Sequence, residues 1–186
     1  ALACLAPAPD VVSWWPGDGN GNDIRGGNHG TLAGDATTVP GKVGQAFSFA
    51  GAGEVLVADA NNLDLATAVT MQAWINPATC PHGYCAIVAK SDMVNGGRAY
   101  GMWLTGPGAA FPTQPGALHV EASGNGNAYA FTAGGAIPNN VWTHVAGVIT
   151  AGGEIRIYIN GQLQPVTSAG SPSPAIGRTS PMRPRG

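Results

Sequence analysis

The stretch EIRIYINGQLQPV, from Glu154 to Val166, places two alternating runs of apolar and polar residues on either side of Asn160-Gly161. Alternation with a period of two is typical of a β-strand that buries one face. The Asn-Gly pair favours the positive φ angles of a type I′ turn, which joins two antiparallel strands. The stretch therefore predicts a β-hairpin, and similar strand signals recur along the chain.

Short apolar runs bounded by Gly, Pro, Asn or Asp predict further strands along most of the sequence. With EIRIYI (154–159), the predicted strands are VVSWW (11–15), QAFSFA (45–50), EVLVA (54–58), VTMQAWI (69–75), CAIVAK (85–90), YGMWL (100–104), ALHVEA (117–122), AYAFTA (128–133) and WTHVAGVIT (142–150). No window of about eleven residues shows helical periodicity. Many short strands at fairly even spacing indicate an all-β sandwich or barrel.

The composition agrees with a single β-rich domain. Of 186 residues, 44% are hydrophobic, which is enough for a real core, and only 10% are charged. The net charge of −2, with no basic cluster, argues against nucleic acid as a partner. No apolar run approaches the roughly 18 residues that span a membrane.

The three cysteines point to an oxidising compartment. Cys80 and Cys85 bracket the short loop CPHGYC, and we predict that they form a disulfide. A zinc site that includes His82 is an alternative, but no second Cys/His cluster supplies the remaining ligands. A reduced structural pair is another. Cys4 is then left over, as a free thiol, an intermolecular bridge or a lipidated residue.

The loop GDGNGNDIRGGNHG (17–30) is the richest polar segment of the chain. It begins like an EF-hand, but Asp23 stands where that loop needs Gly and His29 where it needs Glu. It also lacks the GK[ST] signature of a phosphate loop. Two interpretations stay open: a calcium loop, or Asn and Asp side chains that only make turns.

Several segments in order resemble the laminin-G-like, concanavalin A-like domains of bacterial extracellular proteins. They are WWPGDGNGNDIRGGNHGTLAG (14–34), VPGKVGQAFSFAGAGEVLVAD (39–59), LDLATAVTMQAWINP (63–77), VWTHVAGVIT (141–150) and IRIYINGQL (155–163). The resemblance implies a two-sheet antiparallel jelly-roll sandwich over residues 11–178, between an N-terminal extension (1–10) and a C-terminal tail (179–186). It also implies an extracellular or cell-surface location.

The same resemblance implies a structural calcium ion in the polar loop. Asp18 and Asp23 are the best expected ligands, and Asn20, Asn22 and Asn28 are further oxygen donors.

The resemblance breaks off near the C-terminus. In the family, the stretch after Ile-Gly-Arg continues into another strand with an acidic pair, whereas this sequence stops at Gly186. One explanation is that the sequence is a piece of a longer protein. The other is that a neighbouring subunit supplies the missing strand, as in a surface filament or layer. A sheet that lacks a strand leaves a row of unpaired backbone N–H and C=O groups, and such an edge can dock a strand from another chain.

Candidate ligand-binding residues come from the middle strands. Tyr100 and Trp103 point to opposite faces of one strand, so one of them could line a glycan groove with Arg98 and His119. Trp74 and Trp142 lie in the most apolar strands and are expected in the core.

The sequence carries no convincing catalytic motif. No G-x-S-x-G signature accompanies the histidines, and Glu54, Glu121 and Glu154 occur singly, whereas glycosidases use paired carboxylates. We therefore expect no enzyme, but a non-catalytic extracellular binding or adhesion module, with carbohydrate as ligand and calcium as a structural ion. The alternative is a structural subunit of a bacterial surface filament or layer, assembled as a homo-oligomer.

Overall fold

The computed structural model describes residues 8–65, 67–92, 97–123 and 127–170. At positions 91, 92, 97, 98, 123 and 127 it describes the backbone but not the side chains. The chain divides into two compact units, Ala1–Leu63 and Asp64–Gly186. The last predicted segment, the tail at 179–186, and Cys4 lie outside the described residues.

The first unit is built from short antiparallel pairs. Strand β1 (Gly30–Ala33) pairs with β4 (Glu54–Val57), and β2 (Thr37–Pro40) pairs with β3 (Gln45–Ser48). A 3-10 turn, η1 (Asn61–Leu63), ends the unit. Its buried residues, within the part that the structure describes, are Gly17, Gly21, Asp23 and Asn28. This interior is therefore polar and glycine-rich, with no buried apolar side chain among those residues.

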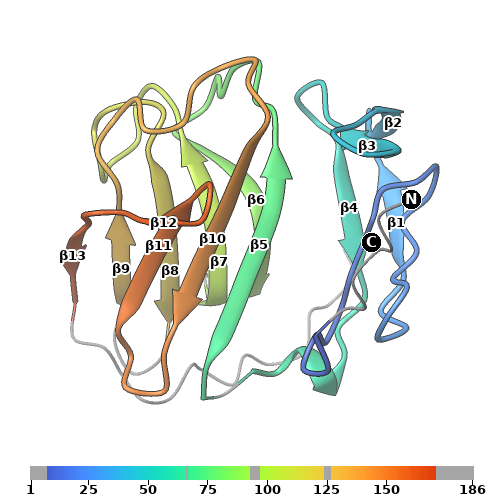
Figure 1. Cartoon of the computed structure of the whole chain (residues 1–186), viewed down its shortest axis with the longest axis horizontal. Coiled ribbons are helices and arrows are strands. Elements are labelled where there is room, and N and C mark those ends of the chain that lie inside the picture. Colours follow the sequence, from blue (N-terminus) through green and yellow to red (C-terminus); the bar gives the residue numbers. More distant parts are fainter. Residues whose placement is uncertain (1–7, 66, 93–96, 124–126, 171–186) are drawn as a thin grey trace. The chain divides into compact units, whose positions relative to one another are not determined.

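The second unit contains two antiparallel sheets (Figure 1). One sheet has the order β12-β11-β10-β5 and the other the order β13-β9-β8-β7-β6. The strands are β5 (Val69–Ile75), β6 (Tyr84–Asp92), β7 (Gly97–Thr105), β8 (Leu118–Ser123), β9 (Asn127–Phe131), β10 (Thr143–Ile149), β11 (Ile155–Ile159), β12 (Gln162–Leu163) and β13 (Thr167–Ala169).

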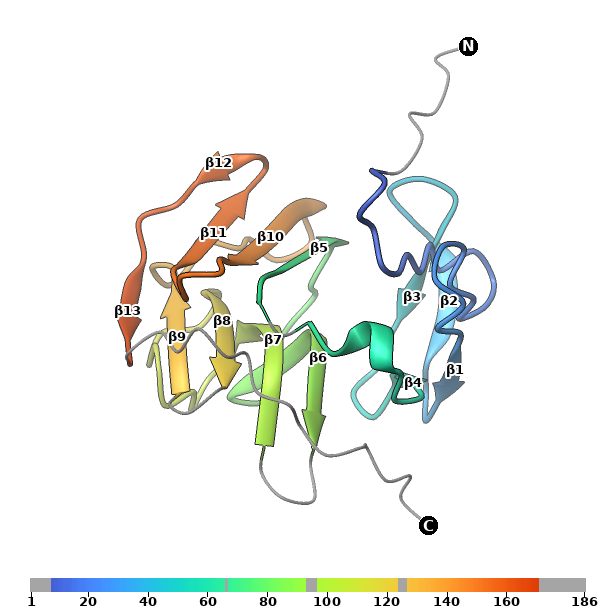
Figure 2. The same ribbon diagram turned by 90° about the horizontal axis from the view of Figure 1, so that it is seen from below.

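The two sheets lie face to face and enclose the core (Figure 2). Alternate side chains of each strand enter it, as the period-two pattern requires. The largest buried apolar side chains come from both sheets: Met102, Leu118 and Val120 from one, and Val145, Ile149 and Ile157 from the other. The predicted all-β sandwich is thereby confirmed.

The predicted hairpin is present. Asn160 and Gly161 have φ angles of 49° and 78°, and Ile159 pairs with Gln162 across the turn. The prediction of a strand at 11–15 is wrong, because the backbone there bonds to the polar loop: Trp14 N–H donates to Asp23 and Trp14 carbonyl accepts from Ile24. Strands β1, β2 and β13 were not predicted.

The expectation that Trp74 lies in the core is also wrong. Val69 and Met71 fill the core from β5, so the alternation sends Trp74 to the opposite face. There its side chain is 49% exposed and meets the His144 ring edge-on at 5.4 Å between ring centres. Trp142 is half-buried.

The close approach of the two sheets gives a first prediction. A Cβ added to Gly147 of β10 would lie 2.7 Å from Cγ2 of Val120 in the facing sheet. We expect Gly147→Leu to lower the free energy of unfolding by about 1–3 kcal/mol or more, through overpacking. The control is Gly152→Leu, since Gly152 lies in an exposed turn. Urea unfolding measures both; equal midpoints for the two variants would contradict this packing.

Candidate functional site

The polar loop of the first unit is organised by one carboxylate. Oδ1 of Asp23 accepts hydrogen bonds from the backbone N–H of Trp14 (2.9 Å) and Arg25 (2.8 Å). Its Oδ2 accepts from the N–H of Gly26 (3.1 Å) and Asn28 (3.0 Å). Asp23 is 4% exposed, so a buried negative charge is held by four backbone donors.

Asn28 joins the same loop to the segment before it. Its side-chain amide donates to the hydroxyl of Ser13 (2.7 Å), and its backbone carbonyl accepts from the indole N–H of Trp15 (2.7 Å). Two further predicted oxygen ligands, Asp18 and Asn20, also accept backbone hydrogen bonds. Oδ1 of Asp18 accepts from Gln45 N–H (2.8 Å), and Oδ1 of Asn20 accepts from Asn22 N–H (2.9 Å).

This arrangement changes the titration of Asp23. Burial on its own raises the pKa of the carboxyl, but the four backbone hydrogen bonds outweigh it and lower the pKa from 3.8 to about 2. The carboxylate is therefore the form that the folded loop stabilises.

A calcium ion would need these oxygens to face a common point. Each Asp23 oxygen already accepts two N–H groups, which occupy the roughly four lone-pair positions of a carboxylate. No group of three or more His, Cys, Asp or Glu side chains that could hold a metal is found in the described part of the chain. Asp23 does not fit the role of calcium ligand in this geometry, and calcium binding by the loop stays a prediction.

A second candidate region lies on the five-stranded sheet, on the face opposite the core. Leu118 and Val120 of β8 point into the core, so His119 and Glu121 point the other way. The register places Trp103 of β7 opposite His119 on one side and Phe131 of β9 opposite it on the other. The face therefore gathers aromatic side chains from neighbouring strands. We call Tyr84, Trp103, Phe111, His119, Tyr129 and Phe131 the aromatic platform.

The rings of the platform are in mutual contact. The His119 ring stacks on Tyr129 (5.5 Å between centres) and lies parallel to Phe131 at 6.4 Å. The Tyr84 and Trp103 rings meet it edge-on at 5.4 and 5.9 Å. Phe111 continues the row beside Tyr129, at 5.9 Å. Such stacked and edge-to-face pairs are the favoured aromatic geometries.

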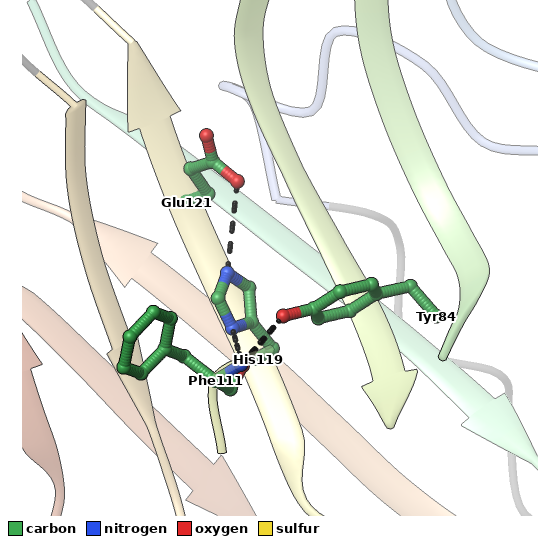
Figure 3. A network of polar contacts seen from close by, with 4 residues as sticks. All are labelled: Tyr84, Phe111, His119 and Glu121. Atoms are coloured by element: carbon green, nitrogen blue, oxygen red, sulfur yellow. Dashed lines mark hydrogen bonds and ion pairs between the residues drawn. The ribbon is translucent and has the colours of Figure 1, made fainter. Parts of the chain in front are cut away.

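Phe111 belongs to the β7–β8 connection and is fixed through its backbone (Figure 3). The Tyr84 hydroxyl accepts from Phe111 N–H and donates to Phe111 carbonyl, both at 2.9 Å. The same carbonyl lies 3.0 Å from Nδ1 of His119. Because a carbonyl only accepts, Nδ1 carries a proton. Nε2 of His119 faces Oε2 of Glu121 at 3.6 Å, so the ring links the carboxylate to the connection.

The platform includes two of the four predicted ligand-binding residues. Trp103 and His119 belong to it, 8% and 4% exposed. Tyr100 does not, because it faces the core on the other side of β7, so the two residues take opposite faces as the sequence predicts, and Trp103 is the one on the platform. The Arg98 side chain lies outside the described residues.

Sequence reasoning missed the more accessible rings. Phe111 is 55% exposed, and Tyr84, Tyr129 and Phe131 are half-buried. The two-residue spacing of Tyr129 and Phe131 in AYAFTA signalled a shared face, but not which strand would lie beside it.

The disulfide between Cys80 and Cys85 is confirmed. It closes the turn that leads into β6, next to Tyr84. The pair is therefore not a zinc site in this structure.

The buried carboxylate of the loop gives a pH prediction. A folded-state pKa lowered from 3.8 to about 2 contributes stability above pH 3.8 that is lost as the pH falls towards 2. The contribution amounts to about 2 kcal/mol. We expect Asp23→Asn to remove this acid-dependent part of the free energy of unfolding of the first unit. Exposed Asp10 provides the control, Asp10→Asn, which should keep it; an unchanged acid slope in Asp23→Asn would contradict the assignment.

The two hydrogen bonds between the Tyr84 hydroxyl and the Phe111 backbone give a prediction for local dynamics. Tyr84→Phe removes both hydrogen bonds to the Phe111 backbone, each worth roughly 1 kcal/mol. We expect hydrogen exchange of the Phe111 amide to accelerate about tenfold or more by NMR. Tyr158→Phe, on β11, is the matched control. Equal exchange in both variants would show that the hydroxyl does not hold the connection.

Comparison with known proteins identifies the family. A laminin-G-like family model, described as the concanavalin A-like lectin/glucanases superfamily, matches residues 49–183. No curated protein and no solved structure matches the chain. No helix within the described residues has the length and apolar character needed to cross a membrane. Domains of the matched kind are binding modules in general and are usually extracellular. The chain belongs to the concanavalin A-like lectin/glucanase superfamily.

Proposed function

We propose that this protein is a non-catalytic, extracellular carbohydrate-binding module that holds sugar rings against its aromatic platform. One observation carries the proposal: the Phe111 ring is 55% exposed and lies beside Tyr129, while its backbone is clamped by Tyr84 and His119. Leaving such a ring in water is unfavourable, by up to about 1.5–3 kcal/mol for a whole side chain. A fixed and exposed ring is therefore a ready binding surface.

The chemistry of sugars suits such a surface. The apolar C–H face of a pyranose ring packs on an aromatic ring, and polar groups around it supply orientation, as in small-molecule sites generally. Rings held in place before binding lose little conformational freedom when the ligand arrives. The platform offers this preorganisation through contacts among Phe111, Tyr129 and Phe131.

The charges on this face favour binding over hydrolysis. Glu121 is the one carboxylate among the described side chains of the platform face, and hydrolysis of a glycosidic bond ordinarily uses two. The other described carboxylates of this unit lie elsewhere: Asp64 is paired with Lys90, and Glu154 with Arg156. The disulfide supports secretion to an oxidising compartment.

The test is a screen of the full chain against a panel of plant, fungal and bacterial polysaccharides, followed by calorimetry with the best binder. We expect Phe111→Ala to weaken that affinity about five- to tenfold, since one aromatic contact is worth roughly 1–1.5 kcal/mol. Phe49→Ala is the matched control, because Phe49 is 50% exposed but lies in the first unit.

Other outcomes would overturn the proposal. Equal affinity in the two variants would remove the platform from binding. Concentration-dependent polymers in light scattering, without affinity for any polysaccharide, would favour the structural-subunit alternative. Release of reducing sugar from the panel would show an enzyme.

A further inference from the structure

We propose that the polar loop at 17–30 is completed from within, by the Asp23 carboxylate, and that its folded form requires no metal cation. In a calcium loop, oxygen atoms converge on a central cation. Here, backbone N–H groups converge on a central carboxylate. The polarity of the loop is thus the reverse of that of a cation site.

The Asp23 carboxylate is saturated with hydrogen bonds. The four donors to Asp23 all lie at 2.8–3.1 Å. A cation bound to either oxygen would have to displace N–H groups from it. The buried N–H of Asn28 and the partly buried N–H groups of the other donors would then lose their acceptor, which is unfavourable.

The four N–H donors to Asp23 come from both sides of it in the sequence. Trp14 lies nine residues before Asp23, whereas Arg25, Gly26 and Asn28 follow it within five. One side chain therefore fixes the turn and also attaches the preceding segment to it. A calcium ion would be expected to do the same work in a cation-filled loop.

Glycine makes this approach possible at one particular position. A Cβ at Gly26 would collide with the carbonyl oxygen of Val12 and reach 3.1 Å from Oδ2 of Asp23. Close backbone packing around the carboxylate therefore explains the glycine at position 26. A cation with inward-turned backbone carbonyls is not needed to explain this glycine.

Two of the other predicted ligands, Asp18 and Asn20, are also engaged. Oδ1 of Asp18 and Oδ1 of Asn20 each accept a backbone N–H. Because the described part of this unit buries no apolar side chain, these polar bonds have a large share in its order. The loop is therefore a fold-determining element whose charge is internal.

The experiment compares hydrogen exchange of the full chain in EGTA and in excess calcium, resolved by NMR at the four donor amides. We expect wild-type exchange rates at Trp14, Arg25, Gly26 and Asn28 to agree within a factor of about two, a small fraction of the tenfold that 1.4 kcal/mol represents. We also expect no shift of Tm between the two buffers.

Two variants distinguish stabilisation by the Asp23 carboxylate from stabilisation by a bound cation. Asp23→Asn replaces one oxygen by an NH₂ group, so two of the donors lose their acceptor, and exchange at those amides should rise at least tenfold in both buffers. Asp18→Asn, which keeps all four donors on Asp23, should leave them unchanged. Terbium titration of wild-type protein supplies a readout that does not depend on either variant folding, and we expect no sensitised emission from Trp14 or Trp15.

The proposal is overturned if EGTA accelerates wild-type exchange at these amides. It is equally overturned if calcium raises the wild-type Tm, or if terbium emission appears in wild-type protein and disappears with Asp23→Asn. Unaltered exchange in Asp23→Asn would also overturn it.

Discussion

The alternation of side chains along β8 is the constraint on which the larger unit depends. Leu118 and Val120 enter the core, and His119 and Glu121 take the opposite face. A slip of one residue in the pairing would exchange the two sets. It would place an imidazole and a carboxylate between the sheets, at the cost of burying polar groups without partners. The hydrophobic core and the aromatic platform are therefore consequences of the same register.

The smaller unit follows another principle. Its strands are four residues long, and its described part buries no apolar side chain. Carboxylates take over part of the task of a core by gathering backbone donors: Asp23 accepts four N–H groups, and Asp35 accepts those of Ala50 and Ala52. This explains why a segment so rich in Gly, Asn and Asp can adopt a defined structure, and why its Asp residues need not imply a metal.

Period-two patterning made most of the fold predictable from the sequence. It located the strands of the larger unit except β13, and Asn160-Gly161 located the tightest hairpin. The errors arose where hydrophobicity was preferred to alternation: Trp74 is apolar, yet the positions of Val69 and Met71 already committed it to the outer face. The apolar run VVSWW predicts a strand, but the Trp14 N–H bonds to Asp23 in a loop, a partner that no local pattern reveals.

The candidate site was less predictable because it depends on pairing between strands. Tyr129 and Phe131 share a face with His119 only through the β8–β9 register, which no local pattern specifies. Phe111 lies in a connection and reaches the platform through hydrogen bonds from Tyr84 and His119. The alternation along β7 predicts that Tyr100 and Trp103 take opposite faces, but it does not say which of the two faces the core.

The polar groups beneath the platform constrain the binding mode proposed above. Among the described residues, no buried side-chain nitrogen or oxygen lacks a hydrogen-bond partner. Nδ1 of His119 is hydrogen-bonded to the Phe111 carbonyl, so a ligand that used this nitrogen would have to break that bond. In the binding mode proposed above, affinity comes from the accessible ring faces of Phe111 and its neighbours. The hydrogen bond between His119 and Phe111 serves to hold those rings still, because a rigid aromatic surface loses less freedom on binding than a mobile one.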